Sequence, residues 1–168
     1  GLEAAAEKLL FAKRESIRAL EVKLHNVEGE PIDSMYSTEP VQVTVTYECL
    51  EEIEDLRIVA FFTDDQNNPL VASQNTDDQK NQTFHRRAKG VYRSSVTLPA
   101  NFFSEHRYYL SVHFYHARVQ NLNFERILPL DIQFQGYHNV QIAKCDWAWF
   151  RPQLDWKTEP VPTGSDLP

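Results

Sequence analysis

The feature that most constrains this chain is the strict alternation of side chains over residues 41–49, VQVTVTYEC. Valines, a tyrosine and a cysteine take every second position, and glutamine, threonines and glutamate take the positions between them. Successive side chains of a β-strand point to opposite faces of its sheet. The run therefore predicts a strand with one buried face and one polar face.

Further runs of this kind follow one another, and residues that favour turns close each of them. They cover residues 17–25, 56–62, 70–73, 90–98, 107–117 and 124–134. Residues 56–62 are apolar on both faces, which is typical of a central strand. No helical segment separates the runs, which excludes a parallel α/β sheet. The pattern predicts an all-β fold, specifically an immunoglobulin-like antiparallel β-sandwich, with a closed barrel as the alternative.

The two ends of the chain differ from this pattern. Residues 2–15 combine alanine and leucine with charged residues and contain no glycine or proline, which predicts a short N-terminal linker helix. We expect a linker helix over residues 1–15, a β-sandwich domain over 16–158 and a disordered tail over 159–168. The lone methionine, Met35, lies inside the chain. We therefore expect the chain to be part of a longer protein.

Composition and charge exclude several classes of protein. The formal net charge of −7 argues against a nucleic-acid partner, because binding to phosphates needs a positive field. The longest apolar runs are too short to cross a bilayer, and the first residues do not have the pattern of a signal peptide. The two cysteines, Cys49 and Cys145, are expected to be free thiols in a reducing compartment.

The sequence also lacks the motifs of common enzymes. It has five glycines, and neither a phosphate-binding glycine loop nor a nucleophile elbow occurs. His113 and His116 are three residues apart, so on a strand they point to opposite faces and make poor joint metal ligands. Carboxylates gather at residues 51–55, 64–65 and 77–78, as is typical of solvated turns, and a hydrolase that uses them is the remote alternative. We expect no catalytic residue, metal or cofactor.

Aromatic residues are frequent in the last third of the chain. Within the run 107–117, one set of alternate positions is apolar and is predicted to face the core: Tyr108, Leu110, Val112 and Phe114. Three tryptophans follow, and burial in the core or in an interface is the predicted role of Trp147, Trp149 and Trp156.

The opposite face of the same run is the candidate binding surface. It carries Tyr109, Ser111, His113 and Tyr115, which are too polar for a core and too aromatic for an ordinary solvent face. Aromatic rings suit the apolar C–H face of a sugar, and hydroxyl and imidazole groups suit its hydroxyls. Arg93 is a possible flanking donor. The alternatives are ordinary packing, or burial of this face under the leading helix or a second subunit.

The order of several short motifs resembles one known family. Residues 36–43 (YSTEPVQV) match its entry strand, and residues 61–76 match its hairpin, which ends in Asn-Thr. Residues 90–99 and 108–112 match its "G-x-y-x-v-x-x-l-P … Y-x-l-x-v" segment, and Gly136 with Trp147 matches its closing motif. Over about residues 16–150 the chain resembles the C-terminal carbohydrate-binding domain of the Wzt-type ATPase subunit of ABC transporters that export O-antigen polysaccharide.

The resemblance implies an immunoglobulin-like sandwich that forms a homodimer by exchanging its terminal strand. It also implies a cytoplasmic location, peripheral to the inner membrane, with an ATPase and a transmembrane export subunit as partners. Catalysis would belong to the ATPase and not to this domain. The expected function is recognition of O-antigen polysaccharide before export, and the alternative is an immunoglobulin-like module that binds a protein partner.

Overall fold

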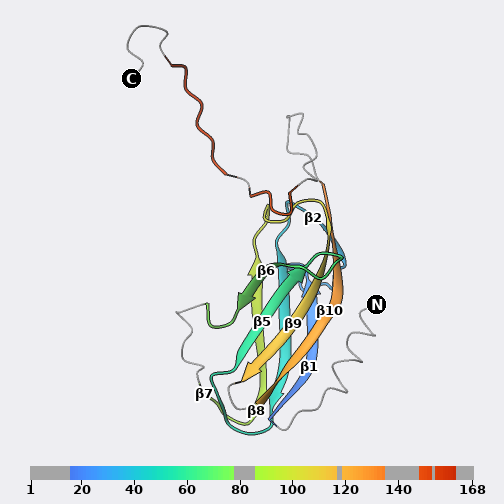
Figure 1. The fold of residues 1–168 in the computed structure, drawn as a ribbon, viewed down its shortest axis with the longest axis vertical. Coiled ribbons are helices and arrows are strands. Elements are labelled where there is room, and N and C mark those ends of the chain that lie inside the picture. Colours follow the sequence, from blue (N-terminus) through green and yellow to red (C-terminus); the bar gives the residue numbers. More distant parts are fainter. Residues whose placement is uncertain (1–15, 78–85, 117–118, 135–147, 153, 162–168) are drawn as a thin grey trace.

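The structure is a computed structural model that describes residues 16–77, 86–116, 119–134, 148–152 and 154–161. These residues form ten strands (Figure 1). The strands are β1 (Ile17–His25), β2 (Ser34–Tyr36), β3 (Val41–Cys49), β4 (Ile53–Glu54), β5 (Arg57–Thr63), β6 (Pro69–Gln74), β7 (Arg86–Arg87), β8 (Gly90–Leu98), β9 (Arg107–His116) and β10 (Val119–Gln133).

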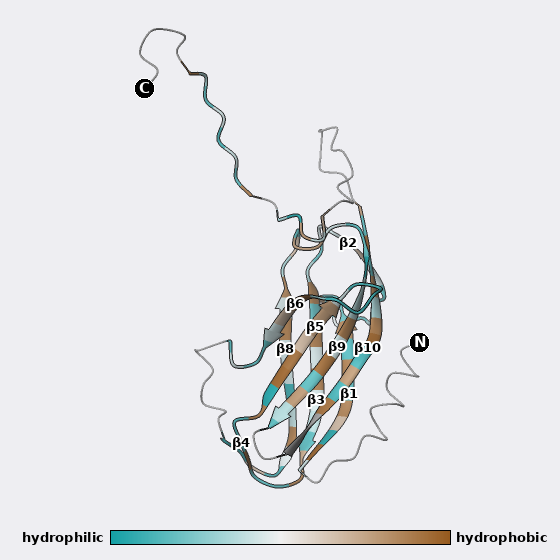
Figure 2. Ribbon diagram, in the orientation of Figure 1, coloured by the Kyte–Doolittle hydropathy of each residue, from teal (hydrophilic) through white to brown (hydrophobic). Residues whose placement is uncertain are grey.

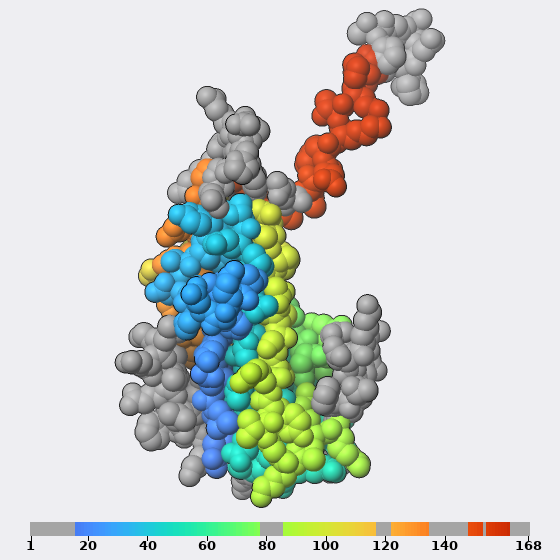
Figure 3. Space-filling view, turned by 180° about the vertical axis from the view of Figure 1, so that it is seen from behind, coloured from blue at the N-terminus to red at the C-terminus, as the bar shows by residue number. Residues whose placement is uncertain are grey.

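Two sheets form the body of the molecule. The small sheet has the order β1-β3-β8, and its three strands lie side by side in Figure 3. The large sheet has the order β2-β10-β9-β5-β6, and a separate two-stranded ladder joins β4 to β7. Tyr47 of β3 meets Phe114 of β9 edge to face, with ring centroids 5.7 Å apart, so the two sheets pack against each other. Figure 2 shows the apolar residues concentrated in these strands.

The prediction of an all-β fold is confirmed for the described residues. The predicted linker helix over residues 1–15 lies outside them, and the proposed domain boundaries remain a prediction. The expectation of purely antiparallel sheets is wrong at one place, because β2 pairs with β10 in parallel. This pairing involves three residues of β2, which is too short a segment for hydrophobic alternation to reveal it.

The longer strands were predictable, and the shortest were not. β1, β3 and β8 have the predicted bounds, whereas β10 begins at Val119, before the predicted residue 124. The predicted turn at residues 51–55 contains β4, and the predicted loop at 74–89 contains β7. These two strands have two residues each and pair only with each other, so no periodic signal marks them.

The core lies between the sheets, where the alternation of β3 and β9 predicted it. On β9 the inward side chains of Tyr108, Leu110, Val112 and Phe114 are at most 1% exposed. The corresponding face of β3 is also buried, and its Cys49 carries a free thiol whose pKa is raised, chiefly by burial. The buried faces of the two sheets thus form one continuous core.

The segment after the sandwich has two parts. Trp149 packs on His106, with ring centroids 4.2 Å apart, and its carbonyl accepts a hydrogen bond from Tyr108 Oη at 2.7 Å. Trp156 is 91% exposed, and the chain around it runs away from the sandwich (Figure 1). Trp149 is therefore partly buried against the core, and Trp156 is not part of the core, so burial of Trp156 in an interface stays a prediction. Trp147 lies outside the described residues.

Candidate functional site

The candidate surface is the outer face of the large sheet around β9. Tyr109, His113 and Tyr115 lie there half-buried, because β9 directs its other side chains into the core. Phe61 of β5 joins them from the neighbouring strand and meets His113 edge to face, with centroids 4.6 Å apart. The structure thus brings three of the predicted residues together and adds an aromatic ring from the adjacent strand.

His113 is held at the centre of this face by two hydrogen bonds. Its Nε2 donates to Glu125 Oε1 at 2.5 Å, because an ionised carboxylate only accepts. Its Nδ1 lies 2.8 Å from Tyr115 Oη, and in a neutral imidazole this nitrogen accepts the phenolic proton. The two bonds fix the tautomer of the His113 ring. They link Glu125, His113 and Tyr115 into one hydrogen-bonded chain.

Arg126 occupies the other end of the same face. Its guanidinium carbon lies 3.9 Å from the centroid of the Tyr109 ring, a close cation–π contact. Its Nη1 also donates to the carbonyl of Asp65 at 2.7 Å. The positive charge of Arg126 therefore lies over the Tyr109 ring, which was predicted to stack on a sugar.

The backbone at Arg126 explains how its side chain reaches Tyr109. Arg126 has a φ of 50°, and the register of β10 against β9 shifts between Phe124 and Leu128. Ser111 lies beneath this irregularity at 1% exposure, and its Oγ accepts a hydrogen bond from Arg126 N at 2.7 Å. Such an irregular strand re-aims a side chain, and here it turns Arg126 over the sheet.

Arg93 is placed elsewhere. It is exposed on β8 in the small sheet, where it pairs with Thr46 of β3, whereas the other four predicted residues share β9 in the large sheet. A shallow hollow on the small sheet is lined by Arg93, Thr44, His25 and neighbouring polar residues. The structure does not bring Arg93 to the β9 face.

An ion pair holds the end of the β9–β10 ladder that lies next to β2. Arg107 Nε and Nη2 donate to the two carboxylate oxygens of Asp131 at 2.7 and 2.6 Å. These bonds lower the pKa of Asp131 below its ordinary value and raise the pKa of Arg107. The fork geometry fixes the register of the two strands that carry the candidate surface.

Phe61, Glu125 and Arg126 are the members of this face that sequence reasoning missed. Phe61 lies in a run that is apolar on both sides, so its outward position carries no special signal. Arg126 has a left-handed backbone conformation, which non-glycine residues adopt rarely. Since no glycine stands at this position, the sequence gives no sign of that conformation. Cross-strand register, which sequence periodicity does not supply, is what brings these residues to β9.

Among the described residues, no cluster of three or more histidine, cysteine, aspartate or glutamate side chains has the arrangement of a metal site. The same part of the chain contains no helix with the length and apolarity that crossing a bilayer requires.

A comparison with known families shows to which family the chain belongs. A family model described as the Wzt C-terminal domain matches residues 13–137. The chain belongs to the Wzt C-terminal domain family. The resemblance inferred from the order of the motifs is thereby confirmed.

Solved structures agree with this assignment at the level of the fold. The crystal structure of the C-terminal domain of wzt matches with a TM-score of 0.68 at 8% identity, over 88% of this chain and 87% of that chain. The X-ray structure of Northeast Structural Genomics Consortium target SoR45 gives a TM-score of 0.31 at 17% identity, over 79% of this chain and 97% of that chain. A comparison with curated proteins gives no match. At 8% identity the Wzt C-terminal domain structure supports the shared fold and not the details of a site.

Proposed function

We propose that this Wzt C-terminal domain is a non-catalytic carbohydrate-binding domain that recognises O-antigen polysaccharide for export by an ABC transporter. The observation that carries the proposal is the half-buried aromatic and polar surface on the outer face of β9, in a chain of this family. Tyr115, His113 and Phe61 supply ring edges and faces, while Glu125 and Arg126 supply hydrogen-bonding charge.

The chemistry of this surface suits a sugar. A pyranose presents an apolar C–H face that packs on an aromatic ring, and its hydroxyls both donate and accept hydrogen bonds. Glu125 is an acceptor and Arg126 is a donor, and both are charged, so their bonds to hydroxyls are strong. The Tyr109 ring packs against the guanidinium of Arg126. Ser111 Oγ accepts a hydrogen bond from the backbone N–H of Arg126 and so helps to position that residue.

The wider assembly follows from the same proposal. The domain forms a homodimer and associates with an ATPase and a transmembrane export subunit, at the cytoplasmic side of the inner membrane. Family membership supports these partners. We also infer that the sandwich is immunoglobulin-like, and the division of the strands into β1-β3-β8 and β10-β9-β5-β6 supports this. No cofactor enters the proposal.

The test is a calorimetric titration of the protein with O-polysaccharide from its own source strain, with an unrelated polysaccharide as the specificity control. We expect Tyr115→Ala, and separately Tyr109→Ala, to weaken binding by about tenfold or more. Tyr115→Ala removes an aromatic surface, and Tyr109→Ala removes the ring on which Arg126 packs. Tyr36→Ala is the matched control, since Tyr36 is an exposed tyrosine on β2 of the same sheet.

Saturable binding to the cognate polymer, lost in both β9 variants and retained in the Tyr36 variant, supports the proposed site. Unchanged affinity in both β9 variants contradicts that site. Failure of the folded wild-type protein to bind either polymer favours the alternative, a module that binds a protein partner.

A further inference from the structure

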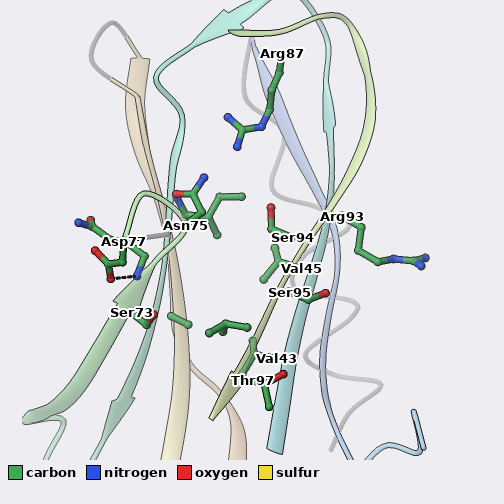
Figure 4. Close-up of a pocket in the computed structure, with 14 residues that line it drawn as sticks. Val43, Val45, Ser73, Asn75, Asp77, Arg87, Arg93, Ser94, Ser95 and Thr97 are labelled. Carbon is green, nitrogen blue, oxygen red and sulfur yellow. Dashed lines mark hydrogen bonds between the residues drawn. The ribbon is translucent and has the colours of Figure 1, made fainter. Parts of the chain in front are cut away.

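A cleft lies away from the β9 face, between the edges of the two sheets. β6 ends the large sheet and β8 ends the small sheet, and the two strands do not pair with each other. A cleft of about 720 Å³ opens between them (Figure 4). Its floor is apolar and consists of Val43 and Val45 from β3 and Ile58 and Ala60 from β5. The volume lies within the range of about 300–1,000 Å³ that is usual for small-ligand sites.

Hydroxyl groups line the walls above this floor. On β8, Ser94 belongs to the inward set of side chains but stays half-buried, because β6 does not cover it. On β6, Ser73 pairs with the inward residue Ala60 and lines the opposite wall. Figure 4 shows Ser73 and Ser94 on opposite sides of the open space. The cleft therefore offers hydroxyl groups over an aliphatic base.

Arg87 closes one end of the cleft, and its guanidinium is turned into the space between the walls (Figure 4). The residue is only 6% exposed. Its Nη1 donates to the carbonyl of Leu56 at 3.4 Å, but that oxygen already accepts a closer bond from Asn75 Nδ2 at 3.1 Å. Its Cζ lies 6.0 Å from the centroid of the Tyr47 ring.

Within the part of the chain that the structure describes, no carboxylate forms an ion pair with Arg87. The nearby acids are engaged by its neighbour, since Arg86 Nη2 lies 2.6 Å from Glu54 Oε1 and Arg86 Nε lies 3.5 Å from Glu52 Oε1. A buried guanidinium is costly unless an anion and further hydrogen bonds compensate it. Arg87 is therefore poised to receive an anion inside the cleft.

Two other charged residues line the cleft at its rim. Asp77 is exposed, and its Oδ2 accepts a hydrogen bond from the backbone N–H of Gln74 at 2.9 Å. Arg93 is exposed on the outer face of β8, and Figure 4 shows its guanidinium directed away from the cleft. The charge inside the cleft is thus that of Arg87, while the carboxylate of Asp77 stays at the entrance.

We propose that this cleft binds a sugar that carries a carboxylate. The fork of Arg87 receives the carboxylate, Ser73 and Ser94 bond to ring hydroxyls, and the valine floor packs on the C–H face of the ring. The choice of a sugar as the bearer of the anion rests on the proposed function. The buried guanidinium of Arg87 is the group that calls for an anion.

The test is an NMR titration of the isotope-labelled 168-residue protein with glucuronate, with glucose and inorganic phosphate as separate arms. We expect glucuronate to give saturable shifts at the amides of Gln74, Asn75, Ser94 and Ser95, with glucose and phosphate at least about tenfold weaker. Arg87→Gln is expected to weaken glucuronate binding by about tenfold or more. Arg86→Gln is the matched control and is expected to keep glucuronate binding, because Arg86 is exposed and lies outside the cleft.

A second variant keeps the test decisive where Arg87→Gln does not fold. Ser73→Phe fills the cleft from the half-buried wall of β6 and leaves residue 87 as arginine, and it is expected to abolish the same shifts. Tyr115→Ala, which tests the β9 face, is expected to leave glucuronate binding unchanged, so the failures of the two sites are distinguishable. Absence of saturable shifts with glucuronate, equal binding by phosphate, or full binding in a folded Arg87→Gln or Ser73→Phe variant overturns the proposal.

Discussion

At the scale of single residues, Tyr108 shows how a polar atom can serve a core. Its ring is fully buried, and its hydroxyl lies within hydrogen-bond distance of two carbonyls, that of Ser104 at 3.1 Å and that of Trp149 at 2.7 Å. Burial raises the pKa of Tyr108 to about 12, so the hydroxyl remains a donor throughout the neutral range. The residue thus attaches the segment around Trp149 to β9.

Removing this hydroxyl should therefore destabilise the protein although the ring stays in place. We expect Tyr108→Phe to lower the free energy of unfolding by about 1–3 kcal/mol, because buried carbonyls lose their donor. Urea denaturation at pH 7 measures the difference. Tyr36→Phe is the control, and it should change little, since Tyr36 is 43% exposed. Equal effects of the two variants would show that the hydroxyl of Tyr108 is not important for stability.

At the scale of elements, the pairing of β9 with β10 organises the candidate surface. The ladder runs from Arg107 opposite Asp131 to His116 opposite Val119, and it is interrupted near Arg126. The ion pair of Arg107 and Asp131 holds one end, and the interruption turns Arg126 over Tyr109. A regular ladder alone would not place Arg126 there.

The Arg107–Asp131 pair predicts a pH dependence of stability. Because the folded pKa of Asp131 lies below its ordinary value of 3.8, the carboxylate contributes stability at pH values above 3.8 and loses it as the pH falls through the folded pKa. Asp131→Asn should lower the urea midpoint slightly at pH 7, since both side chains are partly exposed. The difference from wild type should shrink with acid and with added salt. A difference that is constant from pH 7 to pH 2 would contradict an ionic contribution.

The same elements show what the sequence could predict. The inward face of β9 was predictable because alternation over ten residues is a strong periodic signal, and the burial of Leu110 and Val112 follows from it. The proximity of Tyr109, His113 and Tyr115 follows for the same reason. The contributions of Phe61 and Arg126 were not predictable, because they depend on the register between strands and on one left-handed backbone conformation. The misplacement of Arg93 has the same origin, since periodicity does not say which strands share a sheet.

At the scale of the whole molecule, aromatic rings lie in the core at both ends of the sandwich. Phe114 of β9 is 1% exposed and meets Tyr47 of the small sheet and Phe124 of β10 edge to face. At the other end of the sandwich, Phe103 packs between Phe62 and Tyr108. In contrast, Trp156 lies on the extended segment and is almost fully exposed.

Deletions of these two kinds of ring should differ sharply. Phe114→Ala should lower the free energy of unfolding by about 3–5 kcal/mol, because it leaves a cavity where the sheets meet. Trp156→Ala should leave the stability of the isolated domain unchanged, because its ring buries little surface in this chain. Urea denaturation of both variants at low protein concentration tests this. A comparable loss in the Trp156 variant would mean that the exposed segment is buried in solution.

The parallel pairing of β2 with β10 also limits the order in which the sandwich can assemble. It joins a strand near the beginning of the described chain to the end of the last long strand, so the edge of the large sheet cannot form until almost all of the sandwich is present. Closing such a long loop costs chain entropy before the contact repays it, and folds dominated by distant pairings fold slowly, in milliseconds to seconds. A chain emerging from the ribosome would therefore hold an incomplete sheet until β10 has been released.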